Sequence, residues 1–574
     1  MALDVAQNLI GDAQYGEALR QMDQLKPRSK FTPPPGDWDP RAAEKELGIT
    51  YETAVREPLG VYCFQEYLKE KSPASVVLLE FVQDVIEYRK IKNLHRRDED
   101  KIWDKYADVL HEYGEDFQSS REAWKDEDKE DRSAAFDALE ATISKRLAKK
   151  DFAAFAQCGA AQMPPGVGAA FLKAGPQATF AGPVPHFLVY LQLKWYNAQR
   201  AREILTIKKF AMFRELGRGA FGAVSGAALH TTGAMVALKM SNRKLVKGKN
   251  AKRLIKGEKD VLALLGDTPS KFCVYLIYSF SDEGFFYFAL PLKTGGDLNF
   301  HLNKSETHTF TVARARFYAA EIMLGVAHMH SLGIIYRDLK PENILLDEEG
   351  HAAISDMGLA VVTNGRRWRG RAGTPGYWAP EMLAKEKYSY AADWWGYGCT
   401  VFEFFVGKCP FSTSLTKMED RDEGVLHFDL EANFPRRIKN ADGKMAFPED
   451  AKELLLKLLR RDPERRYGAQ GVGKIKHHAF FESINWRKMN EHAVEPPWKP
   501  NKHAINAESQ EDLKYKNSEA KYAAEKILPE DNIDEFDYVS KEIHQQHVVK
   551  VLKEYRKGKL PSLENQGGGC CTIS

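Results

Sequence analysis

The chain has 574 residues, enough for roughly three or four domains with hydrophobic cores. Its 43% hydrophobic and 28% charged residues exclude a mostly disordered protein, and its seven cysteines are too few for a disulfide scaffold and fit a reducing compartment. The 83 Lys and Arg nearly cancel the 80 Asp and Glu, and the net charge of +3 gives no reason to expect a nucleic-acid partner.

Residues 1–20 are predicted to form an amphipathic helix, because Leu3, Ala6, Ile10 and Ala13 recur at helical spacing. Such a short helix is marginal alone, so we expect it to order only against a partner. The proline run inside residues 21–48 predicts a linker. We see no signal peptide and no apolar run of about 18 residues, and expect neither a secreted nor a membrane-spanning protein.

Residues 49–200 carry a helical pattern, and an Ala, Gly and Pro-rich stretch over 159–185 is predicted to be irregular. From about 201 to 480 the texture becomes first strand-like and then helical, which predicts an α+β domain. No repeat of fixed period is visible.

A glycine-rich string opens this α+β domain and predicts a hairpin over the phosphates of a nucleotide, because glycine backbone can approach a ligand closely. By itself the string predicts a structural turn equally well. Its members are Leu216, Gly217, Arg218, Gly219, Ala220, Phe221, Gly222, Ala223 and Val224. The strand that contains Ala237 and Lys239 follows, and Lys239 is expected to reach the phosphates and to pair with Glu258. The alternative for Glu258 is a solvated helix carboxylate.

The decisive string is Tyr-Arg-Asp-Leu-Lys-Pro-Glu-Asn at 336–343. An Asp five residues before an Asn matches a protein-kinase catalytic loop, in which Asp338 accepts the proton of the substrate hydroxyl and Asn343 binds a metal. Asp356, in the sequence Asp-Met-Gly, predicts the main Mg²⁺ ligand. An Ala-Pro-Glu string at 379–381 closes the segment, and Arg466 is a candidate ion-pair partner of Glu381. Together these motifs predict a kinase that uses ATP and Mg²⁺.

With these motifs in place, the chain resembles the Ser/Thr protein kinases. Lys340, which follows the catalytic aspartate by two residues, is typical of that class and is implied to be catalytic. The resemblance further implies that Leu290 is the gatekeeper, that Leu292 lies in the adenine hinge and that Asp297 binds the ribose.

Within the AGC-type kinases the chain resembles the G protein-coupled receptor kinases. The resemblance rests on Tyr336 in place of a histidine, the string at 354–360, a Pro and Trp-rich string at 495–500, and helical strings at 57–64 and 187–195. It implies an α+β fold, with a bilobal kinase domain inserted in an all-α RGS-homology bundle (49–200). An AGC-type tail would cover 481–512, and residues 513–545 would return to the bundle.

The activation segment supports this resemblance, because Gly370 stands where other AGC kinases carry a phosphorylated Ser or Thr. Ordering of the loop by a phosphate at this position is then unavailable, and the resemblance implies activation by a receptor through the N-terminal helix. An unstructured N-terminus remains the alternative.

The last residues, 546–574, predict a membrane-targeting tail. Cys571 heads a C-terminal C-a-a-X string that predicts farnesylation, and one lipid chain is too weak an anchor by itself. Palmitoylation of Cys570 and the basic cluster between Lys550 and Lys559 are candidates for the second signal. A solvated basic helix is the alternative for that cluster. We expect a cytoplasmic protein held at the cytosolic face of a membrane.

The resemblance implies that activated G protein-coupled receptors are substrate and activator, with desensitisation as the consequence. An AGC kinase of other substrates and an RGS-homology regulator that binds Gα remain alternatives. Substrate preference stays open: four arginines in 366–371 favour acidic or already phosphorylated tails, whereas Glu342 and Glu403 match positions that accept arginine in basophilic AGC kinases.

Overall fold

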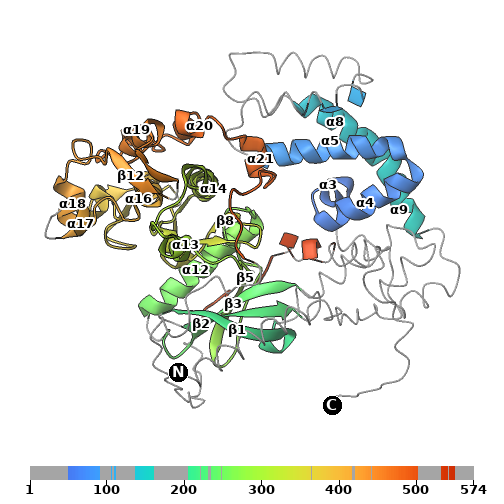
Figure 1. The fold of residues 1–574 in the computed structure, drawn as a ribbon. Coiled ribbons are helices and arrows are strands. Elements are labelled where there is room, and N and C mark those ends of the chain that lie inside the picture. Colours follow the sequence, from blue (N-terminus) through green and yellow to red (C-terminus); the bar gives the residue numbers. More distant parts are fainter. Residues whose placement is uncertain are drawn as a thin grey trace. The chain divides into compact units, whose positions relative to one another are not determined.

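The computed structural model separates the described residues into two units (Figure 1). The unit that contains the predicted kinase domain, the kinase unit, lies within residues 205–229 and 235–540, and the helical unit contains the described residues between 49 and 160 and between 542 and 549. The structure describes residues 49–90, 102, 105–106, 109–110, 136–160, 205–219, 222–229, 234–246, 249–363, 365–416, 420–440, 442–501, 532–540, 542–543, 545–547 and 549. The predicted N-terminal helix (1–20), the linker, Ala220, Phe221, most of 159–185 and the lipidated tail lie outside them. No helix among the described residues is both long and apolar enough to cross a membrane.

The helical unit contains α3 (Tyr51–Ala54), α4 (Pro58–Lys71), α5 (Pro73–Lys90), α8 (Asp137–Arg146), the π-helix η3 (Leu147–Phe152) and α9 (Ala153–Ala160). Thr50 caps α3, and a proline occupies the first turn of α4, where its missing N–H costs nothing. Phe64 lies at the centre of the core and packs against Tyr51, Phe152 and Phe155. Apolar positions at helical spacing thus form one buried face.

Residues beyond 540 rejoin this unit. The Leu59 N–H donates to Gln545 Oε1 at 3.3 Å, and Val549 is buried in the core that Phe64 occupies. Segments almost 500 residues apart in the chain therefore share one hydrophobic core.

The small lobe of the kinase unit is a sheet in the order β1-β2-β3-β5-β4-β14, flanked by helix α12. Its elements are η4 (Ile207–Lys209), β1 (Phe210–Gly219), β2 (Gly222–Leu229), β3 (Met235–Asn242), α12 (Lys249–Asp267), β4 (Tyr278–Ser281), β5 (Phe285–Pro291) and β14 (Tyr538–Val539). Every neighbouring pair is antiparallel, so hairpins and short connections suffice to build the sheet.

The position of strand β14 differs from the domain boundaries that we predicted, because we assigned residues 513–545 as a whole to the helical bundle. Residues 538–539 pair with β4, and Phe536 packs against Phe286 and Phe288. The Ser279 hydroxyl donates to the Phe536 carbonyl at 2.5 Å. The open edge of β4 and the ring contacts of Phe536 therefore hold residues 536–540 on the kinase unit, and the return to the helical unit begins after Ser540.

Tyr538 ties this strand to α12, because its hydroxyl donates to Asp267 Oδ1 at 2.8 Å. We expect Tyr538→Phe to lower the free energy of unfolding of the kinase unit by about 1 kcal/mol, the value of one hydrogen bond. Urea unfolding measures the loss. A variant as stable as wild type would mean that water replaces the bond.

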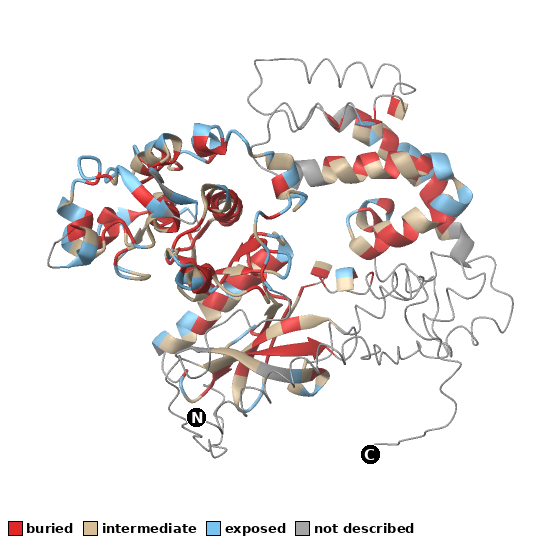
Figure 2. Cartoon of the chain, viewed as in Figure 1, coloured by how far each residue is buried: buried red, intermediate tan, exposed pale blue. Residues whose placement is uncertain are grey.

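The large lobe is mainly helical and is built around α14 and α16, in which most residues are buried; Figure 2 shows α14 largely in red. Its elements are α13 (Leu298–Lys304), α14 (Val312–Ser331), β6 (Ile334–Ile335), η5 (Pro341–Asn343), β7 (Ile344–Leu346), β8 (Ala352–Ile354), η6 (Met357–Leu359), β9 (Val361–Val362), β10 (Trp368–Arg369), α15 (Pro380–Leu383), β11 (Lys387–Tyr388), α16 (Ala391–Val406), α17 (Thr413–Thr416), α18 (Arg421–His427), β12 (Arg437–Asn440), β13 (Gly443–Ala446), α19 (Glu449–Leu458), α20 (Gly473–Lys476), η7 (Ala479–Phe481) and α21 (Trp486–Asn490). Trp394 and Trp395 are fully buried in this core.

The described part of the predicted tail, residues 481–501, begins at the end of η7, includes α21 and then runs along the large lobe. The Trp498 ring lies 4.5 Å from the ring of His301 and 4.0 Å from the Arg314 guanidinium. Burial and the nearby Arg314 charge lower the pKa of His301 to about 4, although its bond to the Gly295 carbonyl opposes the shift. The tail is therefore anchored by a neutral imidazole and a cation–π contact.

Candidate active site

The glycine hairpin forms between β1 and β2, with Gly219 opposite Gly222. A Cβ at Gly222 would lie 1.7 Å from the Met240 carbonyl oxygen, so this glycine is required by the close approach of β3. A Cβ at Gly217 would meet nothing within 4 Å. The backbone beside Gly217 therefore has open space, as a nucleotide site needs. Leu216, Gly217, Arg218 and Gly219 lie on β1, and Ala223 and Val224 on β2.

Lys239 lies between two carboxylates. Its ammonium contacts Glu258 Oε1 at 2.5 Å and Asp356 Oδ1 at 3.9 Å. Burial alone lowers the pKa of Lys239, but the two carboxylates outweigh it, so the pKa is raised and the side chain stays charged. Strand β3, helix α12 and the segment before η6 thus place one cation and two anions together. Glu258 itself is buried, which disfavours the reading as a solvated helix carboxylate.

The residues expected around the adenine and ribose lie along β5 and after it. Ala237 on β3 stands opposite Leu290 on β5, so both belong to neighbouring strands next to Lys239. Leu292 follows the end of β5, and Asp297 caps α13 by accepting the Phe300 N–H at 2.8 Å. One oxygen of Asp297 therefore serves the helix.

Asp338 is the centre of a second polar group. Its Oδ2 accepts from Asn343 Nδ2 at 2.9 Å and lies 3.4 Å from Lys340 Nζ, and its Oδ1 accepts from the Thr374 hydroxyl at 2.7 Å. Lys340 Nζ also donates to Thr374 Oγ1 at 2.7 Å. The activation segment thus closes onto the catalytic loop through Thr374, which our sequence analysis did not assign a role.

Backbone contacts join this loop to the segment that carries Asp356. The Asn343 carbonyl accepts from the N–H of Ser355 at 2.8 Å and from its hydroxyl at 3.0 Å. The Tyr336 hydroxyl donates to the Ser355 carbonyl at 2.5 Å. Asp356 itself has φ 51°, a left-handed conformation that is uncommon outside glycine and is frequent at functional sites. Asp338, Asn343 and Asp356 are therefore neighbours across two adjoining loops.

Asp393 at the start of α16 supports the catalytic loop from below, and sequence reasoning missed it. Its carboxylate accepts from the backbone N–H groups of Tyr336 and Arg337 at 2.9 and 2.8 Å, and from His330 Nε2 at 2.7 Å. The one available signal was an aspartate beside two tryptophans in a strongly apolar helix, where an isolated carboxylate is costly to bury. A second support is the buried, bidentate pair of Glu381 and Arg466, at 2.7 and 2.9 Å.

Glu403 bears on substrate preference. It accepts a hydrogen bond from the Tyr377 hydroxyl, and burial, together with the nearby Glu342 charge, raises its pKa to about 7. Tyr377 and the cation of Arg421 oppose that shift. Near neutral pH a large share of Glu403 is therefore protonated, and its attraction for a substrate arginine is weakened.

The pKa of Glu403 gives a pH prediction. Because the folded protein binds this proton more tightly than the unfolded chain, the contribution of Glu403 to stability decreases as the pH rises from about 5 to about 7, by at most about 1.4 kcal/mol per pH unit. Glu403→Gln keeps a hydrogen-bond acceptor for the Tyr377 hydroxyl and should lack this pH-dependent contribution to the free energy of unfolding. Urea unfolding of both proteins at a series of pH values measures the difference, and parallel pH profiles would contradict the assignment.

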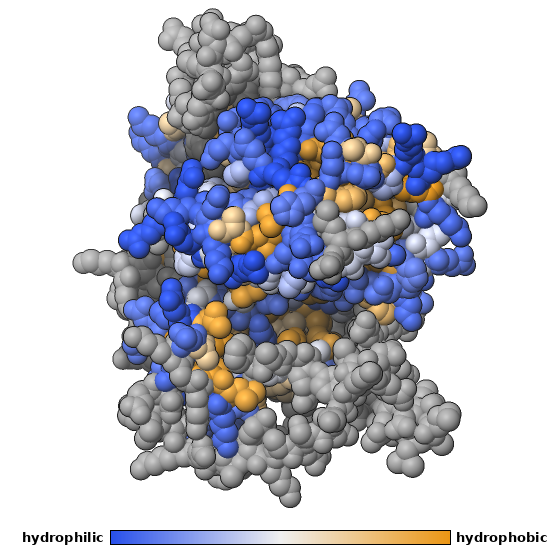
Figure 3. Space-filling model, turned by 90° about the vertical axis from the view of Figure 1, so that its left-hand side faces the viewer, coloured by the Kyte–Doolittle hydropathy of each residue, from blue (hydrophilic) through white to orange (hydrophobic). Residues whose placement is uncertain are grey.

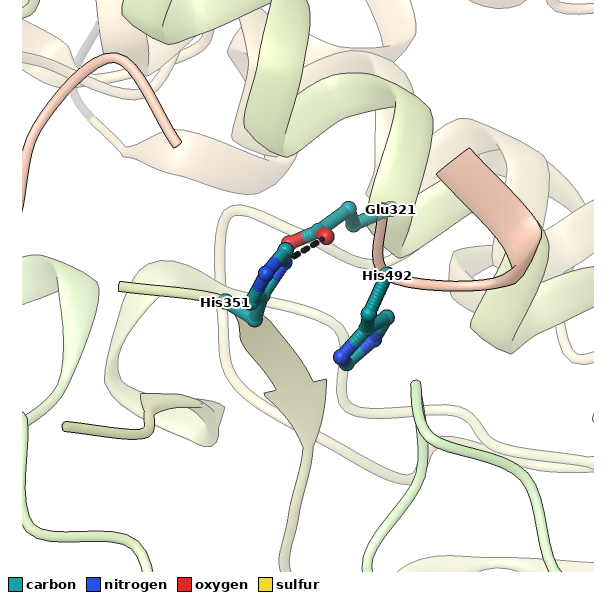
Figure 4. A group of neighbouring side chains, drawn as sticks. All are labelled: Glu321, His351 and His492. Atoms are coloured by element: carbon teal, nitrogen blue, oxygen red, sulfur yellow. Dashed lines mark hydrogen bonds and ion pairs between the residues drawn. The ribbon is translucent and has the colours of Figure 1, made fainter. Parts of the chain in front are cut away.

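Figure 4 shows a third polar group, in which His351 binds Glu321 and stacks on His492. The His351 Nδ1 to Glu321 Oε1 distance is 2.7 Å, and the two imidazole rings are 4.1 Å apart and tilted by 12°. An imidazole binds a metal through a lone pair in its ring plane, so two stacked rings cannot direct both lone pairs at one ion. We interpret this group as a contact that holds the tail, through His492, against the large lobe.

A separate hollow of about 350 Å³ lies on the large lobe between α16, the residues after α18, and α19. Its floor is apolar, with Trp395 stacked on Phe411, and its rim mixes acidic and basic groups such as Glu431 and Arg460. Figure 3 views the side of α17 and α18 and shows small apolar patches in a mostly hydrophilic surface. This hollow contains none of the predicted site residues.

Comparison with known proteins identifies the family to which the chain belongs. Residues 210–481 match the protein kinase domain. The chain is 32% identical to G protein-coupled receptor kinase 1 of Caenorhabditis elegans over 536 residues, which is 88% of this chain and 79% of the relative. The chain belongs to the G protein-coupled receptor kinase family.

Two other similar proteins are also G protein-coupled receptor kinases. G protein-coupled receptor kinase 2 of Drosophila melanogaster is 38% identical over 60% of this chain, and G protein-coupled receptor kinase 4 of Mus musculus is 38% identical over 56%. The chain spans about half the length of these two relatives, 47% and 54%. As a member of the receptor kinase family with a protein kinase domain, the chain is by class a Ser/Thr protein kinase, and its α+β kinase fold agrees with the one we predicted.

Proposed function

We propose that this kinase transfers the γ-phosphate of ATP to Ser or Thr side chains in the cytoplasmic tails or loops of activated G protein-coupled receptors, which promotes desensitisation. The proposed transfer reaction is supported by the geometry of the site. Lys239, Glu258 and Asp356 converge there, beside the loop that contains Asp338 and Asn343. The proposed substrate class is supported by membership of the receptor kinase family.

The site fits Mg²⁺-ATP. The Asp356 side chain is 57% exposed and its Oδ2 has no protein partner among the described residues, so it can ligate a hard cation. Mg²⁺-ATP supplies the transferable phosphoryl group and the charge that balances it. Asp356 and the Asn343 side-chain oxygen would hold metal, and Lys239, fixed by Glu258, would hold phosphate oxygens. The remaining nucleotide contacts fall to the glycine hairpin, Ala237, Leu290, Leu292 and Asp297.

In the proposed mechanism Asp338 orients the acceptor hydroxyl and takes its proton at a carboxylate oxygen. Lys340, 3.4 Å from that carboxylate, contributes positive charge on the same side. Thr374 and Asn343 fix the Asp338 rotamer, so that little reorganisation is needed during transfer.

The receptor assignment is tested by phosphate incorporation into receptor-bearing membranes with and without agonist, using the purified, prenylated protein. We expect incorporation to rise with agonist. Equal incorporation in both samples would contradict a receptor kinase and favour an AGC kinase of other substrates, while leaving the transfer chemistry intact.

We further propose that the helical unit is an RGS-homology bundle interrupted by the kinase, since residues before and after the kinase share its core. The C-terminal tail is proposed to hold the protein at the cytosolic face of a membrane through farnesyl on Cys571, with Cys570 and the basic cluster as second signals.

The anchor has its own test. Cys571→Ser should move the protein from the membrane fraction to the cytosolic fraction of a cell lysate, because one farnesyl chain and the charges of the tail act together. Cys570→Ser should weaken membrane binding less and leave prenylation intact. Unchanged partitioning of Cys571→Ser would count against the lipid anchor.

A further inference from the structure

The activation segment of this kinase is ordered around a cation that has no anionic partner in the described part of the chain. Arg337, next to Asp338, donates from Nε to the Leu359 carbonyl at 2.7 Å and from one terminal nitrogen to the Tyr388 hydroxyl at 3.3 Å. Its guanidinium carbon lies 5.2 Å from the centre of the Trp368 ring. Neutral groups therefore surround this charge, and none of the described carboxylates lies at ion-pair distance from it.

The two aromatic partners come from facing strands. Trp368 on β10 stands directly opposite Tyr388 on β11, and Arg337 contacts both. Trp368 is partly buried against the large-lobe core. Its indole N–H is buried and has no hydrogen-bond partner among the described residues. The polar contact of this side chain is therefore the one between its ring face and the Arg337 guanidinium.

Phosphorylated activation segments are ordered by new ion pairs between arginine and phosphate. Gly370, two residues after Trp368, offers no hydroxyl for such a phosphate. We propose that the Trp368 ring replaces the phosphate, because it binds the Arg337 guanidinium by a cation–π interaction and holds the activation segment ordered without phosphorylation. Trp368 is then a positioning residue, which acts on Asp338 through Arg337 and through the segment that carries Thr374.

The inference rests on the proposed transfer activity, and the experiment keeps the two apart. The kinetic constants of full-length wild type and Trp368→Ala are measured with dephosphorylated casein and with receptor-bearing membranes as acceptors. We expect Trp368→Ala to lower kcat about 10-fold and to change the KM for ATP less than about 2-fold, because a partly desolvated cation–π contact is lost far from the nucleotide. Trp368→Phe retains a ring face and should stay within about 3-fold of wild type.

Order of the segment is read directly by limited proteolysis. Four exposed arginines surround Trp368, namely Arg366, Arg367, Arg369 and Arg371. Trypsin should cut Trp368→Ala at these sites about 10-fold faster than wild type if the segment loses its contact. Trp486→Ala removes another partly buried indole, one that lies 5.6 Å from the Lys476 ammonium, and it should change neither kcat nor cleavage at these four arginines.

A double-mutant cycle tests whether Trp368 acts through Arg337. In an Arg337→Gln background, adding Trp368→Ala should lower kcat less than about 2-fold further, since the shared contact is already gone. Unchanged kcat and trypsin resistance in Trp368→Ala, or additive effects in the cycle, would overturn the inference. A wild type that phosphorylates neither acceptor would instead overturn the proposed function.

Discussion

Asp356→Asn is expected to lower kcat about 100- to 1000-fold, because one negative charge that would neutralise metal and phosphate is lost from the site. The fold should survive, since the Asp356 side chain is 57% exposed and the Lys239 to Glu258 contact is independent of it. Kinetics with saturating ATP and a far-UV spectrum measure the two effects.

The matched control is Asp534→Asn, which changes an exposed aspartate with no side-chain partner in the described part of the chain. Its kcat should equal that of wild type. If Asp356→Asn kept more than about a tenth of the wild-type kcat, the metal role of Asp356 would be wrong. Lys239→Met should have an equally severe effect through the phosphate side of the site.

Arg466→Ala is expected to cost about 3–5 kcal/mol of the free energy of unfolding of the kinase unit. Arg466 and Glu381 form a bidentate pair in which both side chains are almost fully buried, at 0% and 3% exposure. Removing the cation leaves a carboxylate buried without its partner, and this desolvated charge is the source of the loss. Urea unfolding followed by the fluorescence of the buried tryptophans measures it.

An exposed pair of the same chemical type serves as the control. Arg367 and Glu464 lie 3.5 Å apart with 60% and 72% of their side chains exposed, so Arg367→Ala should change stability by less than about 0.5 kcal/mol. The double variant Arg466→Ala, Glu381→Ala should be less destabilised than the sum of the single changes. Equal effects of Arg466→Ala and Arg367→Ala would contradict a role for burial.

The candidate site was largely predictable because its chemistry depends on residue types at fixed spacing. Asp338, Asn343 and Asp356 lie within 19 positions of each other, and local loops suffice to bring them together. The pairing of Lys239 with Glu258 was also accessible, since few acidic residues follow β3 in a helix facing the sheet. The structure adds Thr374, Asp393 and Ser355, whose roles arise only when distant segments pack.

The course of the chain after the kinase was less predictable. We expected residues 513–545 to return to the helical bundle, whereas 536–540 bind the small lobe and Gln545 and Val549 contact the helical unit. The aromatic Phe536 and the alternation around Tyr538 suit an edge strand, but a two-residue strand has no recognisable period. Its position follows from an open sheet edge that no local pattern announces.

The sequence by itself determined the reaction class and named the residues proposed to perform it, because both depend on motifs along the chain. Only the tertiary structure decided which neutral groups surround Arg337, that Glu403 is buried against Tyr377, and that Tyr538 and Val539 pair with the small lobe. These outcomes depend on desolvation and on contacts between residues far apart in the chain, and both exist only once the protein has folded.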